Sequence, residues 1–583
     1  MKPTVNSFTW KIGGQAGDGI MVTGAMLSKI CTRAGLWVTD YSEYPSLIRG
    51  GHNTQVVQVD AEQIFSHDQG IEILVALNEE TVRLHAKELS PGGVILHDPD
   101  KLVINDAMLG NRKDVQVIGV PFLKIANNLG GKDIMRNTVA LGATLGLLRA
   151  PKELIAGVMH DTFSAKGEAV VKMNEDICMA GYQHVMEHVP EQFGWSMQAQ
   201  QLPPRMVMTG NDAIVLGLLH GGLKFYAAYP MTPSSSILTG LAEVASTYGI
   251  VVRHAEDEIS AVNLAIGAAY AGARAATGTS GGGFCLMTEG VGLAAEAEVP
   301  LVIVNAMRPG PSTGLPTWTE QGDLRLVMHA SQGDFPRIIV APGDVTQAFQ
   351  ESARAMQIAE AYHLQVTILT DKYLAESHWS TPHFALEQLQ PTKAGFADAA
   401  MLQGVDTYQR YADTANGVTP RSVPGQPGGV HTANSDEHDA IGHADETSEM
   451  RVLQVQKRER KLAAAMADLP PRVLLYGDAD ADITMVTWGS ATLSCREAMR
   501  KLTRMGIRVN ILQTLYILPF PVEEMHTFFK AAKQTVLVEN NFSGQFGGVL
   551  REYTGLQCNH QLLKYDGRPF WPEEIVDYVK GIV

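Results

Sequence analysis

Glu258 has the type and position that most directly suggest chemistry in this sequence. It ends an acidic run, Glu256-Asp257-Glu258, that follows a predicted strand and opens a helix rich in small residues. The helix dipole stabilises acidic side chains in a first helical turn, which is a sufficient explanation for part of the run. A carboxylate at the end of a strand could also hold a nitrogen atom of a ligand, so both interpretations stay open at this point.

A turn with two prolines surrounds Thr232 earlier in the chain. In the sequence YPMTPSS, which starts at Tyr229, Pro230 and Pro233 fix the backbone on either side of Thr232. Such a rigid turn can present a hydroxyl group to a polar substrate. A helix N-cap at Thr232 or Ser234 would explain the same residues without any ligand.

Two further motifs also follow predicted strands. Ser280 precedes a run of glycines that includes Gly281 and Gly282, and glycine lets the backbone approach a ring or a phosphate very closely. Arg308 follows the strand sequence LVIVNAM and precedes PGPSTG. Open α/β sheets bind ligands at the carboxyl ends of their strands, and the planar guanidinium group suits a carboxylate.

The N-terminal part of the chain has two candidate anion-binding loops. The sequence GGQAGDG at residues 13–19 lies between a strand and a helix, where backbone N–H groups and the helix N-terminus favour an anion. A tight structural turn explains this loop equally well. The loop YPSLIRGGHN offers donors for an anion at Ser46, Arg49, His52 and Asn53. Its plain alternative is a loop with a solvated arginine.

The elements that must position these residues form an α/β pattern. Strands alternate with helices, which predicts α/β domains, the first with a mostly parallel sheet. We expect globular domains at residues 1–190, 206–385 and 470–583. Residues 386–469 form an extended connector, because 392–445 are rich in Gly, Pro, Thr, Asp and His and only a charged helical stretch follows.

Charge and cysteine content exclude several classes of protein. The chain has 583 residues and a formal net charge of -16, which argues against broad binding of nucleic acid. Its five cysteines are scattered without a C-x-x-C pair, so a local iron–sulfur or zinc site is not expected. No signal-peptide pattern and no apolar stretch of about 20 residues is present, so we expect a cytoplasmic protein without a membrane span.

In combination, the motifs resemble the 2-oxoacid:ferredoxin oxidoreductase family. YPMTPSS, EDEISA, ATGTSGGGF and NAMRPGPSTGLPT occur in the family's order. GGQAGDGI and SEYPSLIRGGHNTQV resemble its gamma domain, VTWGS and ENNFSGQFGG its transketolase C-terminal-like domain, and EHDAIGHADETSEMR with KRERK its interdomain arm. The order resembles an alpha subunit with the gamma domain fused ahead of it, and it is more similar to 2-oxoglutarate than to pyruvate enzymes.

The resemblance implies roles for individual residues. Residues 206–385 would be a thiamine pyrimidine-binding domain, in which Glu258 activates the aminopyrimidine of thiamine diphosphate. Thr232 and Arg308 would bind the 2-oxo carboxylate region of the substrate. Ser46, Arg49 and Asn53 would face the active site and coenzyme A. The residues implied to bind the cofactor are Tyr229, Pro230, Glu258, Ser280, Gly281 and Gly282.

The resemblance also implies partners and a reaction. The diphosphate–Mg²⁺ site and the [4Fe–4S] cluster would belong to a beta subunit in an (alpha-beta)2 heterotetramer, with no metal ligand in this chain. The reaction would be coenzyme A-dependent oxidative decarboxylation of 2-oxoglutarate to succinyl-CoA with ferredoxin reduction. It would be reversible to CO2 fixation, as in a reductive TCA cycle. Alternatives are a pyruvate or branched-chain 2-oxoacid enzyme, a thiamine-dependent dehydrogenase component without iron–sulfur chemistry, and a non-catalytic coenzyme-binding protein.

Overall fold

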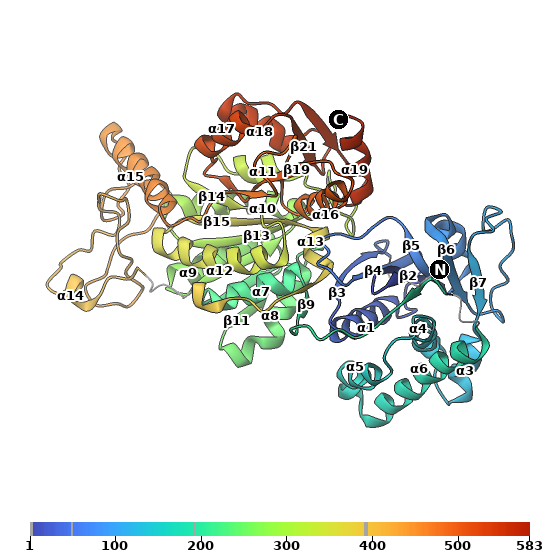
Figure 1. Cartoon of the computed structure of the whole chain (residues 1–583). Coiled ribbons are helices and arrows are strands. Elements are labelled where there is room, and N and C mark those ends of the chain that lie inside the picture. Colours follow the sequence, from blue (N-terminus) through green and yellow to red (C-terminus); the bar gives the residue numbers. More distant parts are fainter. Residues whose placement is uncertain (1–3, 48–49, 190–192, 390–394) are drawn as a thin grey trace. The chain divides into compact units, whose positions relative to one another are not determined.

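The computed structural model describes residues 4–47, 50–189, 193–389 and 395–583, which are organised in two compact units. The first unit combines Met1–Met208 with Glu376–His383 and Trp571–Val583, and the second combines Thr209–Ala375 with Phe384–Phe570. Both are α/β structures (Figure 1). The first unit therefore contains a central and a C-terminal segment of the chain in addition to the N-terminal part. The order of the motifs along the sequence does not indicate this composition.

A mixed sheet forms the first unit, in the order β7-β6-β5-β2-β4-β3-β16-β9. β2, β5, β6 and β7 pair in parallel. The prediction of a mostly parallel sheet is wrong for the half of the sheet that contains β4, β3 and β16. There β4 is antiparallel to β2 and to β3, and β16 is antiparallel to β3. β3 ends at Glu43 and β4 begins at His52, so the connection is too short for the crossover that parallel strands need, and the two strands run antiparallel.

The elements of the first unit surround one large core. Strand β2 places Trp10 and Ile12 in that core, and helix α4 buries nearly all of its residues. The strands are β2 (Phe8–Gln15), β3 (Trp37–Glu43), β4 (His52–Asp60), β5 (Ile71–Ala76), β6 (Leu89–His97), β7 (Gln116–Gly119), β9 (Met206–Thr209) and β16 (His378–Thr381), with a small pair β1 (Thr4–Val5) and β8 (Trp195–Ser196). The helices are α1 (Ile20–Arg33), α2 (Glu79–His85), α3 (Phe122–Asn128), α4 (Arg136–Leu147), α5 (Glu153–Phe163), α6 (Glu168–His188) and α19 (Pro572–Lys580).

The second unit begins with a parallel sheet in the order β11-β10-β12-β13-β15-β14, to which β20 adds an antiparallel edge. Every residue of β13 is buried, as expected for a parallel strand covered by helices on both faces. The strands are β10 (Phe225–Ala228), β11 (Val251–His254), β12 (Ala275–Thr279), β13 (Leu301–Met307), β14 (Arg337–Val340), β15 (Gln365–Asp371) and β20 (Tyr516–Leu518). The helices are α7 (Gly210–His220), α8 (Ser235–Tyr248), α9 (Glu258–Tyr270), α10 (Gly281–Glu296), α11 (Leu324–His329), α12 (Val345–Tyr362) and α13 (Lys372–Glu376).

A second sheet of this unit, in the order β17-β19-β18-β21-β22, forms the C-terminal domain. It is parallel except for β17. Trp488 and Leu537 of this domain share one buried cluster with Ile303 and Leu324 of the preceding domain, so the two domains have a continuous core. The elements are β17 (Val473–Tyr476), β18 (Ile483–Trp488), β19 (Val509–Thr514), β21 (Thr535–Glu539), β22 (His560–Leu563), α16 (Ala491–Arg504), α17 (Val522–Ala531) and α18 (Gln545–Thr554).

The connector between these domains consists mainly of irregular backbone (Figure 1). It contains the short α14 (Ala399–Leu402) and ends in α15 (Ser448–Met466), as the charged helical sequence predicts. Helix α15 buries Lys457, Arg458 and Lys461, which is unusual for charged residues and requires acidic partners. Within the described parts of the chain, no helix has the length and apolar character needed to cross a membrane.

Candidate functional site

The carboxyl edge of the parallel sheet in the second unit brings the predicted residues together. β10, β11, β12 and β13 are parallel neighbours, so their carboxyl ends lie at one edge. Thr232, Glu258, Ser280 and Arg308 each come shortly after one of these strands. This edge is where open α/β sheets bind ligands.

Glu258 is the acidic residue of its run that is buried, with 3% of its surface exposed. Asp257 is the N-cap of α9, because its side chain accepts a hydrogen bond from the backbone N–H of Ser260 at 2.7 Å. The dipole and capping explanation therefore accounts for Asp257. It does not account for Glu258, whose buried Oε1 has no hydrogen-bond partner among the described residues.

Burial also changes the acidity of Glu258. Removal from water raises the pKa of its carboxyl group, and the negative charge of Asp257 adds to the increase. The positive charge of Arg308 opposes it. An unpaired buried carboxyl oxygen is costly, and a ligand that bonds to it would remove that cost.

The glycines at the start of α10 make room for the acidic residues of the site. A Cβ atom on Gly283 would lie 2.4 Å from Glu258 Oε1 and 2.1 Å from Thr279 Oγ1. Gly282 is open, since the nearest atom to a Cβ there would be 3.9 Å away. The motif predicts Gly281 and Gly282 as contact residues, whereas Gly283 is the glycine against Glu258. Gly283 stands in the same glycine run, which could have indicated it.

Arg308 and the Thr232 turn are directly connected. The guanidinium Nη1 of Arg308 donates a hydrogen bond to the backbone carbonyl of Thr232 at 2.8 Å. Burial lowers the pKa of Arg308, while the charges of Asp323 and Glu258 oppose that decrease. The alternative of an N-cap is not supported at Ser234, which occupies the N-cap position of α8 but forms no side-chain capping bond.

Asp323 and Asn305 join this group, and Glu320 lies in the field of Asp323, although none of the three is among the residues predicted from the sequence. Asn305 Nδ2 donates to Asp323 Oδ2 at 3.1 Å, and a Cβ on Gly281 would lie 2.4 Å from the same oxygen. Burial raises the pKa of Asp323 to about 6, against the hydrogen bond from Asn305 and the charge of Arg308. Asn305 is a polar residue inside the apolar strand β13, which is a signal in the sequence; Asp323 has no such local signal.

The other residues of this unit that are predicted to bind the cofactor differ in solvent exposure. Ser280 is buried, and its Oγ has no partner among the described residues. Tyr229 and Pro230 are exposed, and the Tyr229 ring lies 6.2 Å from the ring of His254. Ser280 is therefore available as a buried hydroxyl, whereas Tyr229 presents an open aromatic surface.

The predicted contacts of the first unit lie in and beside β4. Ser46 is exposed, and Asn53 pairs with Gly14 of β2. The Asn53 carbonyl oxygen, Oδ1, is buried without a partner among the described residues. Arg49 lies outside the described residues. In the glycine-rich loop, Asp18 forms an ion pair with Arg136 at 2.7 Å.

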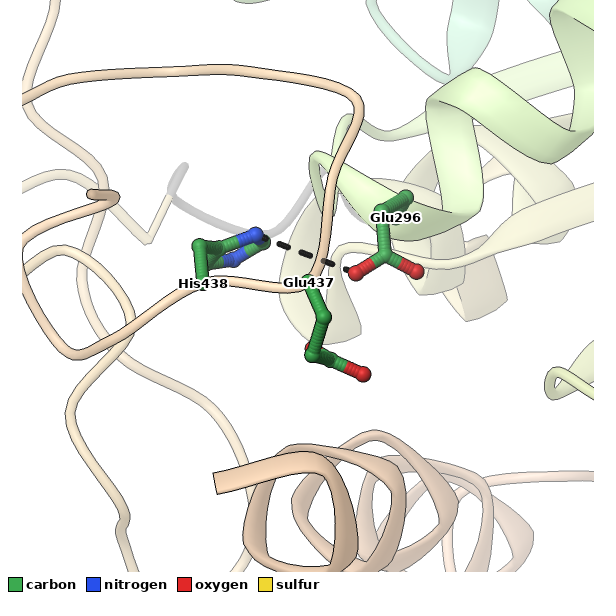
Figure 2. A group of neighbouring side chains, drawn as sticks. All are labelled: Glu296, Glu437 and His438. Atoms are coloured by element: carbon green, nitrogen blue, oxygen red, sulfur yellow. Dashed lines mark ion pairs between the residues drawn. The ribbon is translucent and has the colours of Figure 1, made fainter. Parts of the chain in front are cut away.

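Glu296, Glu437 and His438 form a second cluster, with side chains of the kinds that bind metals (Figure 2). Both oxygens of Glu437 accept hydrogen bonds from Arg458, at 2.9 and 2.8 Å, and His438 Nδ1 lies 2.9 Å from the carbonyl of Asp436. His438 Nε2, in contrast, is buried without a hydrogen-bond partner among the described residues. Arg458 also donates to Glu296 Oε1 at 3.0 Å, so an ion-pair network attaches the connector to α10.

Comparison with known proteins agrees with this architecture. Three family models match: "Pyruvate ferredoxin/flavodoxin oxidoreductase" over residues 9–184, "Pyruvate flavodoxin/ferredoxin oxidoreductase, thiamine diP-bdg" over residues 217–457, and "Pyruvate:ferredoxin oxidoreductase core domain II" over residues 481–575. The chain is 32% identical to subunit alpha of 2-oxoacid:ferredoxin oxidoreductase 2 from Aeropyrum pernix, over 98% of this chain and 97% of that one. The chain belongs to the alpha subunits of the 2-oxoacid:ferredoxin oxidoreductases.

Two other relatives of this alpha subunit act on 2-oxoglutarate according to their names. The 2-oxoglutarate:ferredoxin oxidoreductase from Magnetococcus marinus, solved with 2-oxoglutarate, coenzyme A and succinyl-CoA bound, is 31% identical with a TM-score of 0.91 over 99% of both chains. The 2-oxoglutarate oxidoreductase subunit KorA of Mycobacterium tuberculosis is 28% identical over 98% of this chain and 91% of that one. The predicted family and the gamma-type domain ahead of the thiamine-binding domain are thus confirmed.

The geometry of the edge fits the thiamine diphosphate that the family uses. Glu258 offers a buried oxygen and Ser280 a buried hydroxyl, and neither has a partner in the described parts of the chain. Gly282 leaves open space beside them. A ring with nitrogen donors and acceptors matches this combination of groups.

Proposed function

We propose that this alpha subunit holds the aminopyrimidine end of thiamine diphosphate at Glu258 and the carboxylate of a 2-oxoacid at Arg308 and Thr232. With a beta subunit, it would catalyse coenzyme A-dependent oxidative decarboxylation of 2-oxoglutarate to succinyl-CoA and CO2, with reduction of ferredoxin. The observation that supports the proposal most strongly is the buried Oε1 of Glu258 at the carboxyl edge of the sheet, which no described residue pairs with.

The residues of the chain have distinct tasks in this proposal. When bound, thiamine diphosphate would supply a nucleophilic carbon and an electron sink for decarboxylation of the 2-oxoacid. Glu258 Oε1 bonds to the ring nitrogen and exchanges a proton with it, a task for which a raised pKa is favourable. Arg308 binds and orients the substrate carboxylate. The burial of Glu258 would limit the access of water to the proton that moves there.

The proposal of 2-oxoglutarate as the substrate is based on the similarity of this chain to related proteins. The Magnetococcus marinus enzyme, solved with 2-oxoglutarate bound, is similar over nearly the whole length of both chains. A pyruvate or branched-chain 2-oxoacid is the alternative, because the Aeropyrum pernix relative is named only for 2-oxoacids. A second substrate carboxylate requires another cation, and Arg49 is our candidate by its place in the sequence.

The remaining cofactor sites are assigned to subunits as they are in the family. We propose that Mg²⁺, the diphosphate site and a [4Fe–4S] cluster are on the beta subunit of an (alpha-beta)2 assembly, and that ferredoxin receives the electrons. The loop with Ser46, Arg49 and Asn53 would bind coenzyme A. The reverse direction would fix CO2.

Substitution of Glu258 in the alpha–beta complex tests the proposal. Glu258→Gln keeps the size of the side chain but cannot exchange the proton, so 2-oxoacid-dependent ferredoxin reduction should fall by at least about 100-fold. Glu256→Gln is the matched control, because Glu256 belongs to the same acidic run but is exposed. Equal activity of the two variants would exclude Glu258 from the reaction.

Assays of the wild-type complex with 2-oxoglutarate, pyruvate and a branched-chain 2-oxoacid identify the substrate. The proposal expects the largest kcat/KM for 2-oxoglutarate. A larger kcat/KM for pyruvate would leave the role of Glu258 intact and replace the substrate.

A further inference from the structure

A pocket in the first unit shares no residue with the site described above. Helices α1, α4, α5 and α6 of this unit pack together around it (Figure 1). Its volume is about 460 Å³, within the range of roughly 300–1,000 Å³ that small-molecule sites occupy. Its walls include the apolar side chains of Met26, Phe163 and Met173. The pocket therefore has the size and the apolar lining of a ligand site.

Positive charge prevails at this pocket, although the whole chain has a formal net charge of -16. Lys132 and Lys166 line it, and both are exposed. Among the described residues, no aspartate or glutamate lines the pocket, and neither lysine forms an ion pair. Asp133 and Glu168 are near in sequence, but they are exposed and lie outside the lining. An anion in this pocket would thus meet two ammonium groups.

Three helices begin beside the pocket. The N-cap residues are Gly19 for α1, Met135 for α4 and Gly167 for α6, and none of them forms a side-chain capping bond. Gly19 and Met135 line the pocket, as does Val170 in the first turn of α6. The first N–H groups of a helix have no partner within the helix and carry partial positive charge, which favours a phosphate group.

A buried amide at the same pocket provides a hydrogen-bond acceptor. Asn137, with 7% of its surface exposed, lines the pocket from the first turn of α4. Its Nδ2 donates to the carbonyl of Asp18 at 2.8 Å, and a Cβ on Gly19 would lie 2.4 Å from this nitrogen. Its Oδ1 accepts no hydrogen bond from a described residue. A ligand with an amino group can donate to this oxygen.

We propose that this pocket binds an adenosine phosphate. The phosphate groups bind at the starts of α1 and α6 and at Lys132 and Lys166. The adenine ring packs against the apolar wall with Phe163, and its amino group donates to Asn137 Oδ1. This assigns a task to the glycine-rich loop at residues 13–19, which leads into α1 and which the proposed function leaves unused.

The adenosine phosphate has two sources, which share this chemistry. One is a free nucleotide such as ADP, and the other is the ADP part of coenzyme A. The inference does not depend on the proposed function, because binding to the pocket is measured without turnover.

Isothermal titration calorimetry of the alpha–beta complex with ADP tests the site. We expect Lys132→Ala and Lys166→Ala each to raise the Kd for ADP about five- to tenfold, because each removes a charge-assisted contact. Lys101→Ala is the matched control, since Lys101 is an exposed lysine of the same unit outside the pocket. Adenosine, which lacks the phosphate groups, should bind much more weakly than ADP.

A second variant blocks the pocket instead of removing a charge. Val22 lines the pocket but is 45% exposed, so a larger side chain there does not disturb the core. Val22→Trp should abolish ADP binding at concentrations that saturate the wild type. Met21→Trp is its control, because Met21 is 41% exposed on the same helix and does not line the pocket.

Titration of ADP into the complex saturated with coenzyme A distinguishes the two sources. Loss of the ADP signal assigns the pocket to the ADP part of coenzyme A, and undiminished binding assigns it to a free nucleotide. No ADP binding to the wild type, an equal Kd in Val22→Trp, or binding of octanoate without ADP would overturn the inference. A complex that uses no 2-oxoacid would overturn the proposed function and leave this result unaffected.

Discussion

At the scale of single residues, the character of the candidate site depends on charged groups that lack an ion-pair partner among the described residues. Arg308 lies in the field of Glu258 and Asp323, and it has used one guanidinium N–H for the Thr232 carbonyl. A guanidinium group has several donors in a rigid planar arrangement, so others stay available to a carboxylate. In the proposed function, a substrate carboxylate would lie near two acidic side chains that repel it, and Arg308 would offset that repulsion.

Loss of Arg308 should weaken substrate use without loss of the fold. We expect Arg308→Ala to lower kcat/KM by about 10- to 100-fold, the effect of one charge-assisted contact. Steady-state kinetics of the alpha–beta complex measures this change. Arg253→Ala, at an exposed arginine on β11, serves as the control. An unchanged kcat/KM in Arg308→Ala would remove this residue from the site.

The sequence allowed prediction of those site residues that stand in local motifs. Glu258, Thr232 and Arg308 each follow a strand and lie in a distinctive run, so their meeting at one sheet edge could be inferred. Asp323 could not, because its position depends on hydrogen bonds from residues 540–545, more than two hundred positions later in the chain. Arg49 stays a prediction, since it lies outside the described residues.

At the scale of elements, helix α10 begins where side chains of the site already fill the space. Its first residues are glycines, and Cβ atoms on two of them would overlap with carboxylates: Asp323 at Gly281 and Glu258 at Gly283. Glycine is normally unfavourable within a helix by about 1 kcal/mol relative to alanine. The glycines destabilise the helix by this amount, but they allow Glu258 and Asp323 to lie against its backbone.

A methyl group at Gly283 should therefore displace Glu258. We expect Gly283→Ala to reduce ferredoxin reduction by at least about tenfold, because the new Cβ would be 2.4 Å from Glu258 Oε1. Circular dichroism should show unchanged helix content. Gly267→Ala in α9 is the control, since no atom of a described residue would lie within 4 Å of a Cβ there, and its activity should be normal. Full activity of Gly283→Ala would contradict the packing argument.

At the scale of the whole molecule, Cys31 and Cys178 belong to the core of the first unit, whereas Cys558 belongs to the core of the second. Among the described residues, Cys31, Cys178, Cys495 and Cys558 are free and buried, and only Cys285 is exposed. Burial raises the pKa of Cys178 and of Cys495 to about 12. Thiolates, not thiols, bind iron, so these residues are poor ligands as well as distant in sequence.

The isolated alpha subunit should therefore lack an iron–sulfur chromophore. We expect no visible absorbance band of a cluster and no acid-labile sulfide after purification without the beta subunit. The complex should show both. Stoichiometric iron and sulfide in the isolated chain would contradict the argument from the cysteines.

The composition of the first unit has a consequence for synthesis on the ribosome. Strand β16 pairs with β3, and residues 376–383 and 571–583 belong to this unit although residues 209–375 of the other unit are made before them. Until residue 381 emerges, the β16-facing edge of β3 lacks this partner, and exposed strand edges invite aberrant pairing. The first unit thus receives its last segment, residues 571–583, after the segments of the second unit have been made.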